Sequence, residues 1–271
     1  MKFTDLDSWL SWQETLYPRA IELGLARPRR VYRRLPPLAP DTAVISVAGT
    51  NGKGSTVAVL EGVLGALGVS VASFTSPHLF RYNERIRLDG QPVDDATLMA
   101  AFQAVEDVRR DTGLTYFEFG TLAALTIIGH RAPDVAVLEV GMGGRLDAVN
   151  LIDADVAVIS SIGLDHQAWL GADREAIGRE KAGILRAARP LILGDRQPPA
   201  SILDRAEELA APVARLGVDF GYELSGDQWC FGGSRRRIAG LPAGRFPGPL
   251  LDNASCALEA LDRLDPALLE P

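Results

Sequence analysis

Residues 44–56 read VISVAGTNGKGST, and this stretch decides the fold. Residues 44–48 form a continuous apolar run, which is typical of a strand buried on both faces, and a helix is expected over residues 54–67. The glycines between them let the backbone close around an anion, and the N–H groups at the helix start point at that anion. Lys53 can reach terminal phosphates, while Ser55 or Thr56 can contact a bound Mg²⁺.

The spacing of this glycine loop departs from the general P-loop pattern, G-x-x-x-x-G-K-[ST]. Gly49 precedes Gly52-Lys53 by three positions, and Gly54 separates Lys53 from Ser55. A glycine-rich turn of this kind can be purely structural. The lysine and the two hydroxyls favour phosphate binding over that interpretation.

Composition narrows the class of protein. The chain has 271 residues, 47% of them hydrophobic, and a formal net charge of −7. The length allows one large domain, and the acidic balance argues against a nucleic-acid partner. Two cysteines offer no disulfide framework, and neither a signal peptide nor a membrane-spanning run is found. We expect a cytoplasmic monomer that binds small molecules, without a nucleic-acid or membrane partner.

The order of expected elements predicts an α/β fold with a doubly wound, mostly parallel sheet and flanking helices. Beyond residue 200 the strand signals weaken, and a small β-rich subregion is expected near 213–240, followed by a loop over 241–251. Helices are expected at 7–24, 54–67, 95–110, 118–130, 173–187, 201–210 and 253–264, and strands at 44–48, 69–74, 134–140, 154–160, 190–193, 213–216, 220–224, 228–232 and 235–239.

Polar side chains follow several of the apolar strands. Ser76 follows the second strand, Glu139 lies within the third, and Asp165-His166 comes soon after the fourth. Ligands of open α/β sheets collect at the carboxyl ends of the strands, so these groups should converge with the glycine loop.

Glu139 and His166 are the strongest candidates for metal ligands. A carboxylate inside an apolar run must be paired, protonated or bound to a metal, so a salt bridge is the alternative for Glu139. His166 can equally be an ordinary structural histidine, although Asp165 could orient its ring towards a metal. The glycines of residues 141–144 are either a plain turn or a mobile loop close to the ligand.

Six motifs in this order resemble the folylpolyglutamate synthase and dihydrofolate synthase family, within the Mur ligase superfamily. The resemblance is specific from about residue 5 to 200 and looser to 264. The shorter glycine loop is that superfamily's form of the P-loop. The motifs are AGTNGKGS (48–55), SPHL (76–79), LTYFE (114–118), EVGMGGRLDAVN (139–150), DH (165–166) and GREKAGI (178–184).

The resemblance implies an ATP-dependent carboxylate–amine ligase that acts in folate biosynthesis and one-carbon metabolism. ATP would phosphorylate the carboxylate of dihydropteroate or of a folate, and L-glutamate would then attack the acyl phosphate. Lys53, Lys181 and His166 would be catalytic. ATP would be bound by Thr50, Asn51, Gly52, Lys53, Gly54, Ser55 and Asn253, Mg²⁺ by Ser76, Glu139 and His166, and the pterin substrate by Glu22, Leu23, Gly24, Thr115, Tyr116, Phe117, Glu118, Leu146, Asp147 and Ala148.

Lys181 matches a lysine that the family carbamylates. A carbamate would turn a cation into an anion able to approach Mg²⁺, whereas an exposed helix lysine is the ordinary alternative.

The resemblance also implies a domain division. Residues 1–264 would be the ATP-binding domain, of the central Mur ligase type, and 265–271 the start of a linker to a C-terminal domain that this chain lacks. The isolated chain is then expected to bind nucleotide weakly and to turn over little. The alternatives are another Mur-type amide ligase and a non-catalytic nucleotide-binding module.

Overall fold

The computed structural model describes residues 1–244 and 248–269. Its core is an eight-stranded sheet with the order β4-β3-β2-β5-β1-β6-β7-β8. The strands from β2 to β8 in this order run parallel, whereas β3 and β4 are antiparallel additions at one edge. The main-sheet strands are β1 (Ala43–Ala48), β2 (Val71–Phe74), β3 (Ile86–Leu88), β4 (Gln91–Pro92), β5 (Val135–Glu139), β6 (Val156–Ile159), β7 (Leu191–Leu193) and β8 (Val213–Arg215).

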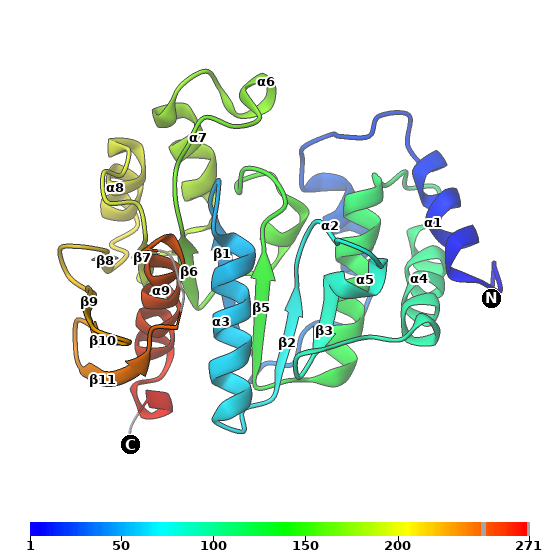
Figure 1. The fold of residues 1–271 in the computed structure, drawn as a ribbon. Helices are drawn as coiled ribbons and strands as arrows, with labels where there is room; N and C mark the ends of the chain where they lie inside the picture. Colours follow the sequence, from blue (N-terminus) through cyan, green and yellow to red (C-terminus); the bar gives the residue numbers. More distant parts are fainter. Residues whose placement is uncertain (245–247, 270–271) are drawn as a thin grey trace.

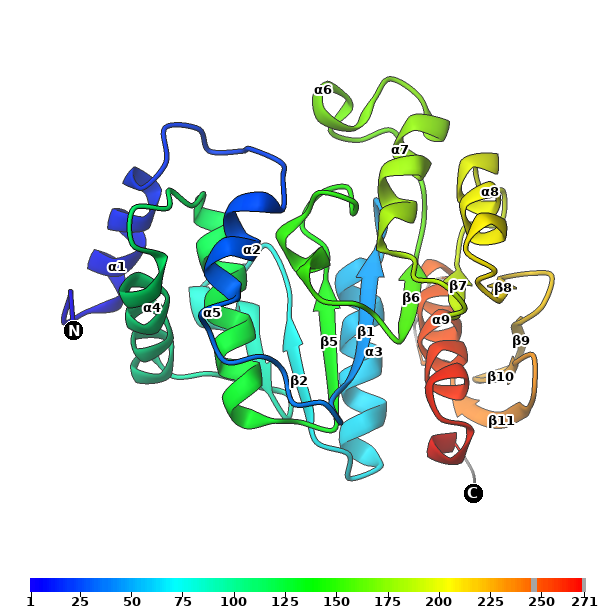
Figure 2. The same ribbon diagram turned by 180° about the vertical axis from the view of Figure 1, so that it is seen from behind.

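Helices cover both faces of this sheet (Figures 1 and 2). Ile45 and Val47 face α3 and α9, while Val44 and Ala48 face the opposite layer, so strand β1 is buried on both sides. This explains its unbroken apolar sequence. The α-helices are α1 (Leu6–Thr15), α2 (Ala26–Tyr32), α3 (Lys53–Ala66), α4 (Asp95–Arg109), α5 (Tyr116–Arg131), α6 (Gln167–Leu170), α7 (Arg174–Lys181), α8 (Ala200–Glu208) and α9 (Gly248–Leu264).

A second, three-stranded antiparallel sheet packs on α9 and has the order β11-β10-β9. Phe231 and Trp229 on its inner face are buried in the same apolar cluster as Leu261 of α9. The strands are β9 (Gly221–Ser225), β10 (Gln228–Gly232) and β11 (Arg237–Pro242), and short 3₁₀ turns occur at Tyr82–Arg85, Ala148–Leu151, Ala182–Ile184 and Pro266–Leu269.

The predicted fold class is confirmed, with corrections at the element level. The helix expected over 7–24 ends at Thr15, because Pro18 cannot donate within a helix and disfavours helical geometry at Tyr17. Helix α2, which follows in the arginine-rich segment, was not predicted. The helix expected over 173–187 ends at Lys181, and the chain continues as a 3₁₀ turn.

Two further corrections concern the C-terminal third of the chain. Strand β8, expected within the small β-rich subregion, pairs instead with β7 in the main sheet. The loop expected over 241–251 is shorter, since β11 reaches Pro242 and α9 begins at Gly248, where Pro249 is tolerated in the first turn. Residues 245–247 of that loop lie outside the described residues. Pro266–Leu269 form a 3₁₀ turn after α9.

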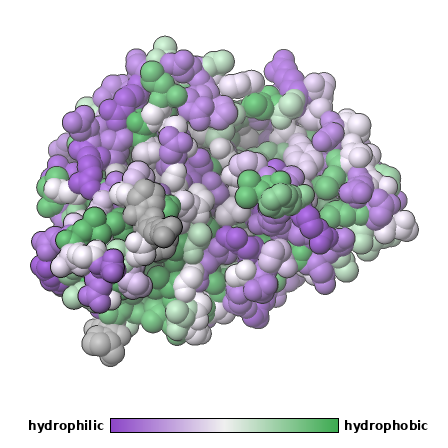
Figure 3. All heavy atoms as spheres, in the orientation of Figure 1, coloured by the Kyte–Doolittle hydropathy of each residue, from purple (hydrophilic) through white to green (hydrophobic). Residues whose placement is uncertain are grey.

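The surface mixes polar and apolar side chains. On the face shown in Figure 3, hydrophilic and hydrophobic residues are interspersed. No helix within the described ranges is both long and apolar enough to cross a lipid bilayer.

Candidate functional site

The glycine loop connects β1 to α3 at the carboxyl edge of the sheet. Gly49 has φ 151° and Gly52 has φ 87°, conformations that favour glycine. A Cβ at Gly49 would lie 2.0 Å from Oγ of Ser160, and one at Gly52 would lie 2.4 Å from Oδ1 of Asn253. Glycine is therefore required at both positions by backbone geometry and by close packing.

Two serines after β6 fix the shape of this loop. Ser160 Oγ donates to the carbonyl of Asn51 at 2.6 Å, and Ser161 Oγ accepts from the Asn51 N–H at 3.1 Å. The Thr50 N–H donates to the Ser161 carbonyl at 2.7 Å. The sequence alone did not indicate this role, because only the β1–β6 pairing brings the two serines to the loop.

The loop has the properties of an anion cradle. Helix α3 begins at Lys53, and the first N–H groups of a helix have no partner within it. The Lys53 ammonium donates to the carbonyls of Gly49 (3.1 Å) and Thr50 (3.4 Å), which holds it over the loop. The Asn253 side chain, on α9, lies against Gly52. The predicted nucleotide-binding residues from Thr50 to Ser55 and Asn253 are thus gathered at one place.

The three predicted metal ligands also lie at this edge. Glu139, the last residue of β5, is 4% exposed, and its Oε2 accepts from the backbone N–H of Ser76 at 3.2 Å. Burial raises its pKa, an effect that the nearby charge of Lys53 opposes. Ser76 and His166 line the same cavity as Lys53. His166 itself is half-exposed, and its Nε2 lies 3.6 Å from Oδ2 of Asp165.

These residues fit a magnesium ion that is shared with a nucleotide. Glu139 forms no salt bridge within residues 1–244 and 248–269, which removes the ion-pair alternative considered for it. In the same ranges no cluster of three or more His, Cys, Asp or Glu side chains is placed to hold a metal. Mg²⁺ is usually bound by one or two carboxylates together with substrate phosphates and water, so this sparse donor set suits it.

Lys181 is buried beside the glycine loop. It is 4% exposed, and its ammonium donates to the Gly49 carbonyl at 2.9 Å, the same oxygen that Lys53 contacts. Burial, and then the charge of Lys53, lower the pKa of Lys181 to about 8. The interpretation of Lys181 as an ordinary exposed helix residue is therefore wrong.

A cavity of about 500 Å³ opens beside Lys53 and extends away from the glycine loop. Most residues predicted to contact the pterin line it, but two do not. Tyr116 lines a different hollow, near His78, and Gly24 is engaged through its backbone with the Leu146 carbonyl. The lining residues are Ala20, Ile21, Glu22, Leu23, Lys53, Ser76, Pro77, Arg85, Thr115, Phe117, Glu118, Gly141, Met142, Leu146, Asp147, Ala148 and His166.

Acidic side chains of this cavity are held in place by hydrogen bonds. Glu118 and Thr115 form a reciprocal capping box at the start of α5, and Arg27 bridges Glu118 and Glu22. Asp147 accepts from the N–H groups of Met142 and Val149 (both 2.9 Å). Burial raises the pKa of Asp147 to about 6 and also raises that of Glu118.

Sequence reasoning missed several lining residues, notably Arg85 and Met142. Met142 lies inside the motif of residues 139–150, so its place in that motif could have indicated that it lines the cavity. Arg85 had no such signal, because it lies outside every motif, at the end of the 3₁₀ turn that precedes β3. Gly141 is close to the ring of Phe117, which leaves no room for a side chain there.

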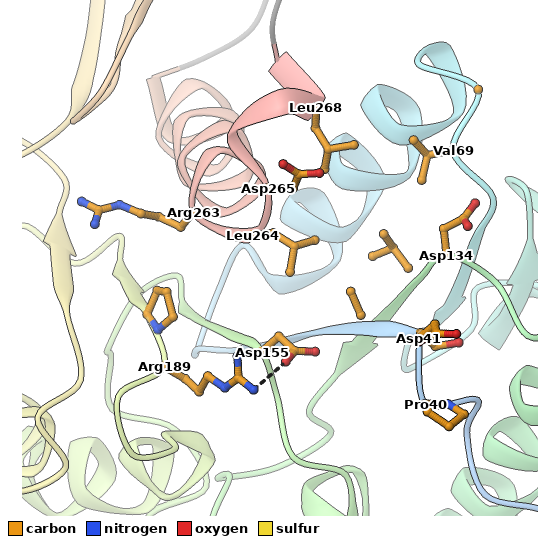
Figure 4. Close-up of a pocket in the computed structure, with 15 residues that line it drawn as sticks. Pro40, Asp41, Val69, Asp134, Asp155, Arg189, Arg263, Leu264, Asp265 and Leu268 are labelled. Carbon is orange, nitrogen blue, oxygen red and sulfur yellow. Dashed lines mark ion pairs between the residues drawn. The ribbon is translucent and has the colours of Figure 1, made fainter.

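Another hollow, of about 600 Å³, lies at the opposite edge of the sheet (Figure 4). Its lining includes Asp41, Asp134 and Asp155, which precede or begin strands, and Asp155 pairs with Arg189 at 3.4 Å. None of the predicted site residues contributes to it. The candidate site is therefore the cavity at the carboxyl edge.

The fold and the glycine loop together define an α/β domain with a P-loop-like turn between β1 and α3. Residues 47–220 match the Mur ligase middle domain, and the chain belongs to that family.

Within this family, the individual proteins that the chain resembles include dihydrofolate synthase/folylpolyglutamate synthases. The chain is 48% identical over 256 residues to the dihydrofolate synthase/folylpolyglutamate synthase of Escherichia coli (strain K12), covering 94% of this chain and 60% of that protein. The structure of E. coli FolC in complex with DHPP and ADP matches with a TM-score of 0.92 and 47% identity, over 97% of this chain and 63% of that one.

A bifunctional folylpolyglutamate synthase/dihydrofolate synthase with Mn, AMPPNP and L-glutamate bound matches with a TM-score of 0.88 and 45% identity, covering 97% and 63%. The chain thus spans about 60% of the length of the relatives that it matches. The resemblance found in the sequence is confirmed.

Proposed function

We propose that this chain acts in the ATP-dependent ligation of L-glutamate to dihydropteroate or to a folate. The observation that carries the proposal is the position of Lys53, which belongs to the anion cradle and also lines the largely apolar cavity. A nucleotide bound in the anion cradle and a flat substrate bound in the cavity would meet at Lys53. The relatives described above, with ADP, AMPPNP, DHPP and L-glutamate in their structures, support the same proposal.

The reaction solves a chemical difficulty, because a carboxylate is a poor electrophile. A carboxylate oxygen attacks the γ-phosphorus of ATP, and ADP leaves. The glutamate amine then attacks the acyl carbon, phosphate leaves and the amine loses a proton. Lys53 and the N-terminus of α3 would offset the negative charge on the transferred phosphoryl group. Ser76, Glu139 and His166 would hold Mg²⁺, which supplies further charge neutralisation.

The cavity offers a complementary surface for a pterin. The ring of Phe117 can pack against a flat heterocycle, and Glu22, Glu118 and Asp147 are acceptors for its N–H groups. Leu23, Leu146 and Ala148 add apolar contact. Thr115 lines the cavity, so we keep it among the residues proposed to contact the pterin. Tyr116 and Gly24 do not line the cavity, and we propose for them only an indirect role in holding the backbone around it.

We further propose that Lys181 is carbamylated. Its neutral amine would attack CO₂ and lose a proton, which leaves a carbamate with one negative charge in place of an ammonium. The lowered pKa of Lys181 supports this step, since only the neutral amine is nucleophilic. The carbamate would then stand beside Lys53 and the magnesium site.

Direct binding measurements separate this proposal from its alternatives. By calorimetry the chain is expected to bind Mg·ADP and, with nucleotide present, dihydropteroate. Preference for a peptidoglycan precursor would indicate another Mur-type ligase. Nucleotide binding without affinity for either acid would indicate a non-catalytic module. Turnover is then measured as ADP release that requires both dihydropteroate and L-glutamate.

A glycine variant tests the nucleotide half of the proposal. Gly52→Ala should abolish Mg·ADP binding, because its methyl group collides with Asn253. Gly68→Ala is a matched control, since Gly68 also has positive φ (73°) but no atom within 4 Å of the added Cβ. Both variants incur similar backbone strain. Equal loss of nucleotide affinity in the two would contradict the proposed cradle.

A further inference from the structure

Arg85 is held rigidly at the wall of the cavity. It ends the 3₁₀ turn Tyr82–Arg85, and its Nε donates to Nδ1 of His78 at 2.9 Å. Its guanidinium carbon lies 5.1 Å from the ring centroid of Tyr82 and 5.8 Å from that of Tyr116. Burial, and then the charge of Arg85, lower the pKa of His78, so this ring stays neutral and available as an acceptor.

The guanidinium fork has no anionic partner in the part of the chain that the structure describes. Its neighbours differ in this respect, because Arg81 pairs with Asp95 and Arg87 with Glu61. The adjacent carboxylate, Glu84, accepts instead from three backbone N–H groups in residues 79–81. Arginine in a partly buried setting is suited to bidentate recognition of a carboxylate or a phosphate.

The cavity is lined by more carboxylate side chains than lysine and arginine side chains. Glu22, Glu118 and Asp147 are acidic and would repel the carboxylate of a substrate acid. Among the described lining residues the lysine and arginine side chains are those of Lys53 and Arg85, and Lys53 is directed at the carbonyls of the glycine loop. Arg85 is thus the cation of the cavity that is available to bind the carboxylate of a substrate.

We propose that Arg85 is a specificity residue that binds the carboxylate end of the pterin substrate and positions it for attack on the nucleotide. This inference rests on the proposed function and assigns a role to a residue outside the motifs that suggested it. The fork would form two parallel N–H···O bonds to the carboxylate, while the ring of the substrate lies against Phe117.

The test compares two ligands that differ only in charge at this end, pteroate and its primary carboxamide. Calorimetry is performed with Mg·AMPPNP present. The unaltered chain should bind pteroate at least about tenfold more tightly, as expected for a charge-assisted bidentate pair. Arg85→Gln should lose most of this preference while its affinity for the carboxamide changes less than about twofold. Arg85→Lys should keep part of it.

Arg81→Gln is the matched control, because Arg81 lies four residues away and its exposed side chain pairs with Asp95. It should keep the full preference for pteroate, and thermal unfolding should show that all variants are folded. The inference is overturned if Arg85→Gln keeps the preference or weakens both ligands equally. A loss confined to AMPPNP affinity would assign Arg85 to phosphate and also overturn it.

Failure of the inference and failure of the proposed function are distinguishable. If the unaltered chain binds pteroate and the carboxamide equally well, Arg85 has no such role but the pterin site stands. If the unaltered chain binds neither ligand, the proposed function is contradicted, and the role of Arg85 with it.

Discussion

Two lysine ammonium groups share one backbone carbonyl, that of Gly49. This arrangement is costly for two cations, and it explains why burial and Lys53 together depress the pKa of Lys181. Lys181 is therefore a lysine whose charge can change close to pH 8. Lys2, the remaining lysine of the sequence, pairs with Glu106 far from the loop along the chain.

Carbamylation of Lys181 should increase with pH through about 8. Below that value the amine is protonated and cannot attack CO₂, and above it the neutral form dominates. The measurement is ¹³C NMR with ¹³C-labelled bicarbonate at fixed dissolved CO₂. Lys181→Arg should remove the carbamate signal, and Lys2→Arg, the control, should retain it. A signal that survives Lys181→Arg would contradict the assignment.

The same shift has a consequence for stability. The pKa of Lys181 in the folded chain, about 8, lies below the ordinary lysine pKa of 10.5 expected in the unfolded chain. Between these values the unfolded chain binds more protons, so this residue makes the free energy of unfolding rise with pH across that window. Below about pH 8 its penalty on the folded state is fully present.

The segment between β6 and α7 carries His166, and its geometry depends on one carboxylate. Asp195, just after β7, accepts from the Ile162 N–H and from Arg174, both at 2.8 Å. Arg174 in turn donates to the Ile162 carbonyl at 3.0 Å. Asp195 therefore ties both ends of the His166 segment to the sheet.

Asp195→Asn should loosen this segment and weaken the proposed magnesium site. We expect the free energy of unfolding to fall by about 1–3 kcal/mol, the usual range for disturbing a hydrogen bond to a charged group. The Mg²⁺ concentration needed for half-maximal AMPPNP binding should rise about threefold or more. Calorimetric titration with Mg²⁺ at fixed AMPPNP measures this.

Asp153→Asn is the control for this substitution. Asp153 also pairs with an arginine, Arg186, but its side chain is 82% exposed. Exposed pairs contribute little, so both stability and the Mg²⁺ requirement should stay close to those of the unaltered chain. An unchanged Mg²⁺ requirement in Asp195→Asn would show that the segment is positioned by other contacts.

The whole molecule consists of a central sheet covered on both faces, with the small antiparallel sheet packed on α9. Helix α9 also carries Asn253, which lies against the glycine loop. The small sheet, which lies beside α9 in Figure 1, therefore supports an element of the proposed nucleotide site.

Phe231→Ala should destabilise the molecule by about 3–5 kcal/mol, the cost of removing a buried aromatic ring. Phe231 is fully buried in the cluster that contains α9. Leu224→Ala, on the neighbouring strand, should change stability by less than about 0.5 kcal/mol, because Leu224 is 59% exposed. Urea denaturation compares the two, and equal effects would show that the small sheet is not part of one cooperative core.

Prediction from the sequence succeeded where the local apolar pattern is enough to place an element in the fold. The apolar runs of β1, β5 and β6 identified a parallel sheet, and strand direction then placed Glu139 and Lys53 at the same edge. It failed where neighbours from another element decide the outcome. The sequence of strand β8 is too weakly apolar to show that it would pair with β7. The first helix was predicted to continue past Pro18, although proline ends it earlier.

The sequence by itself determined the fold class, the position of the glycine loop and the set of polar groups at the carboxyl edge, because apolar periodicity and strand direction are local properties. Only the tertiary structure decided which side chains face the cavity. Tyr116 and Phe117 are adjacent, yet about 100° of helical rotation directs one to each side of α5. Arg85 and Ser160 likewise reach the site through contacts between distant segments, which no local pattern encodes.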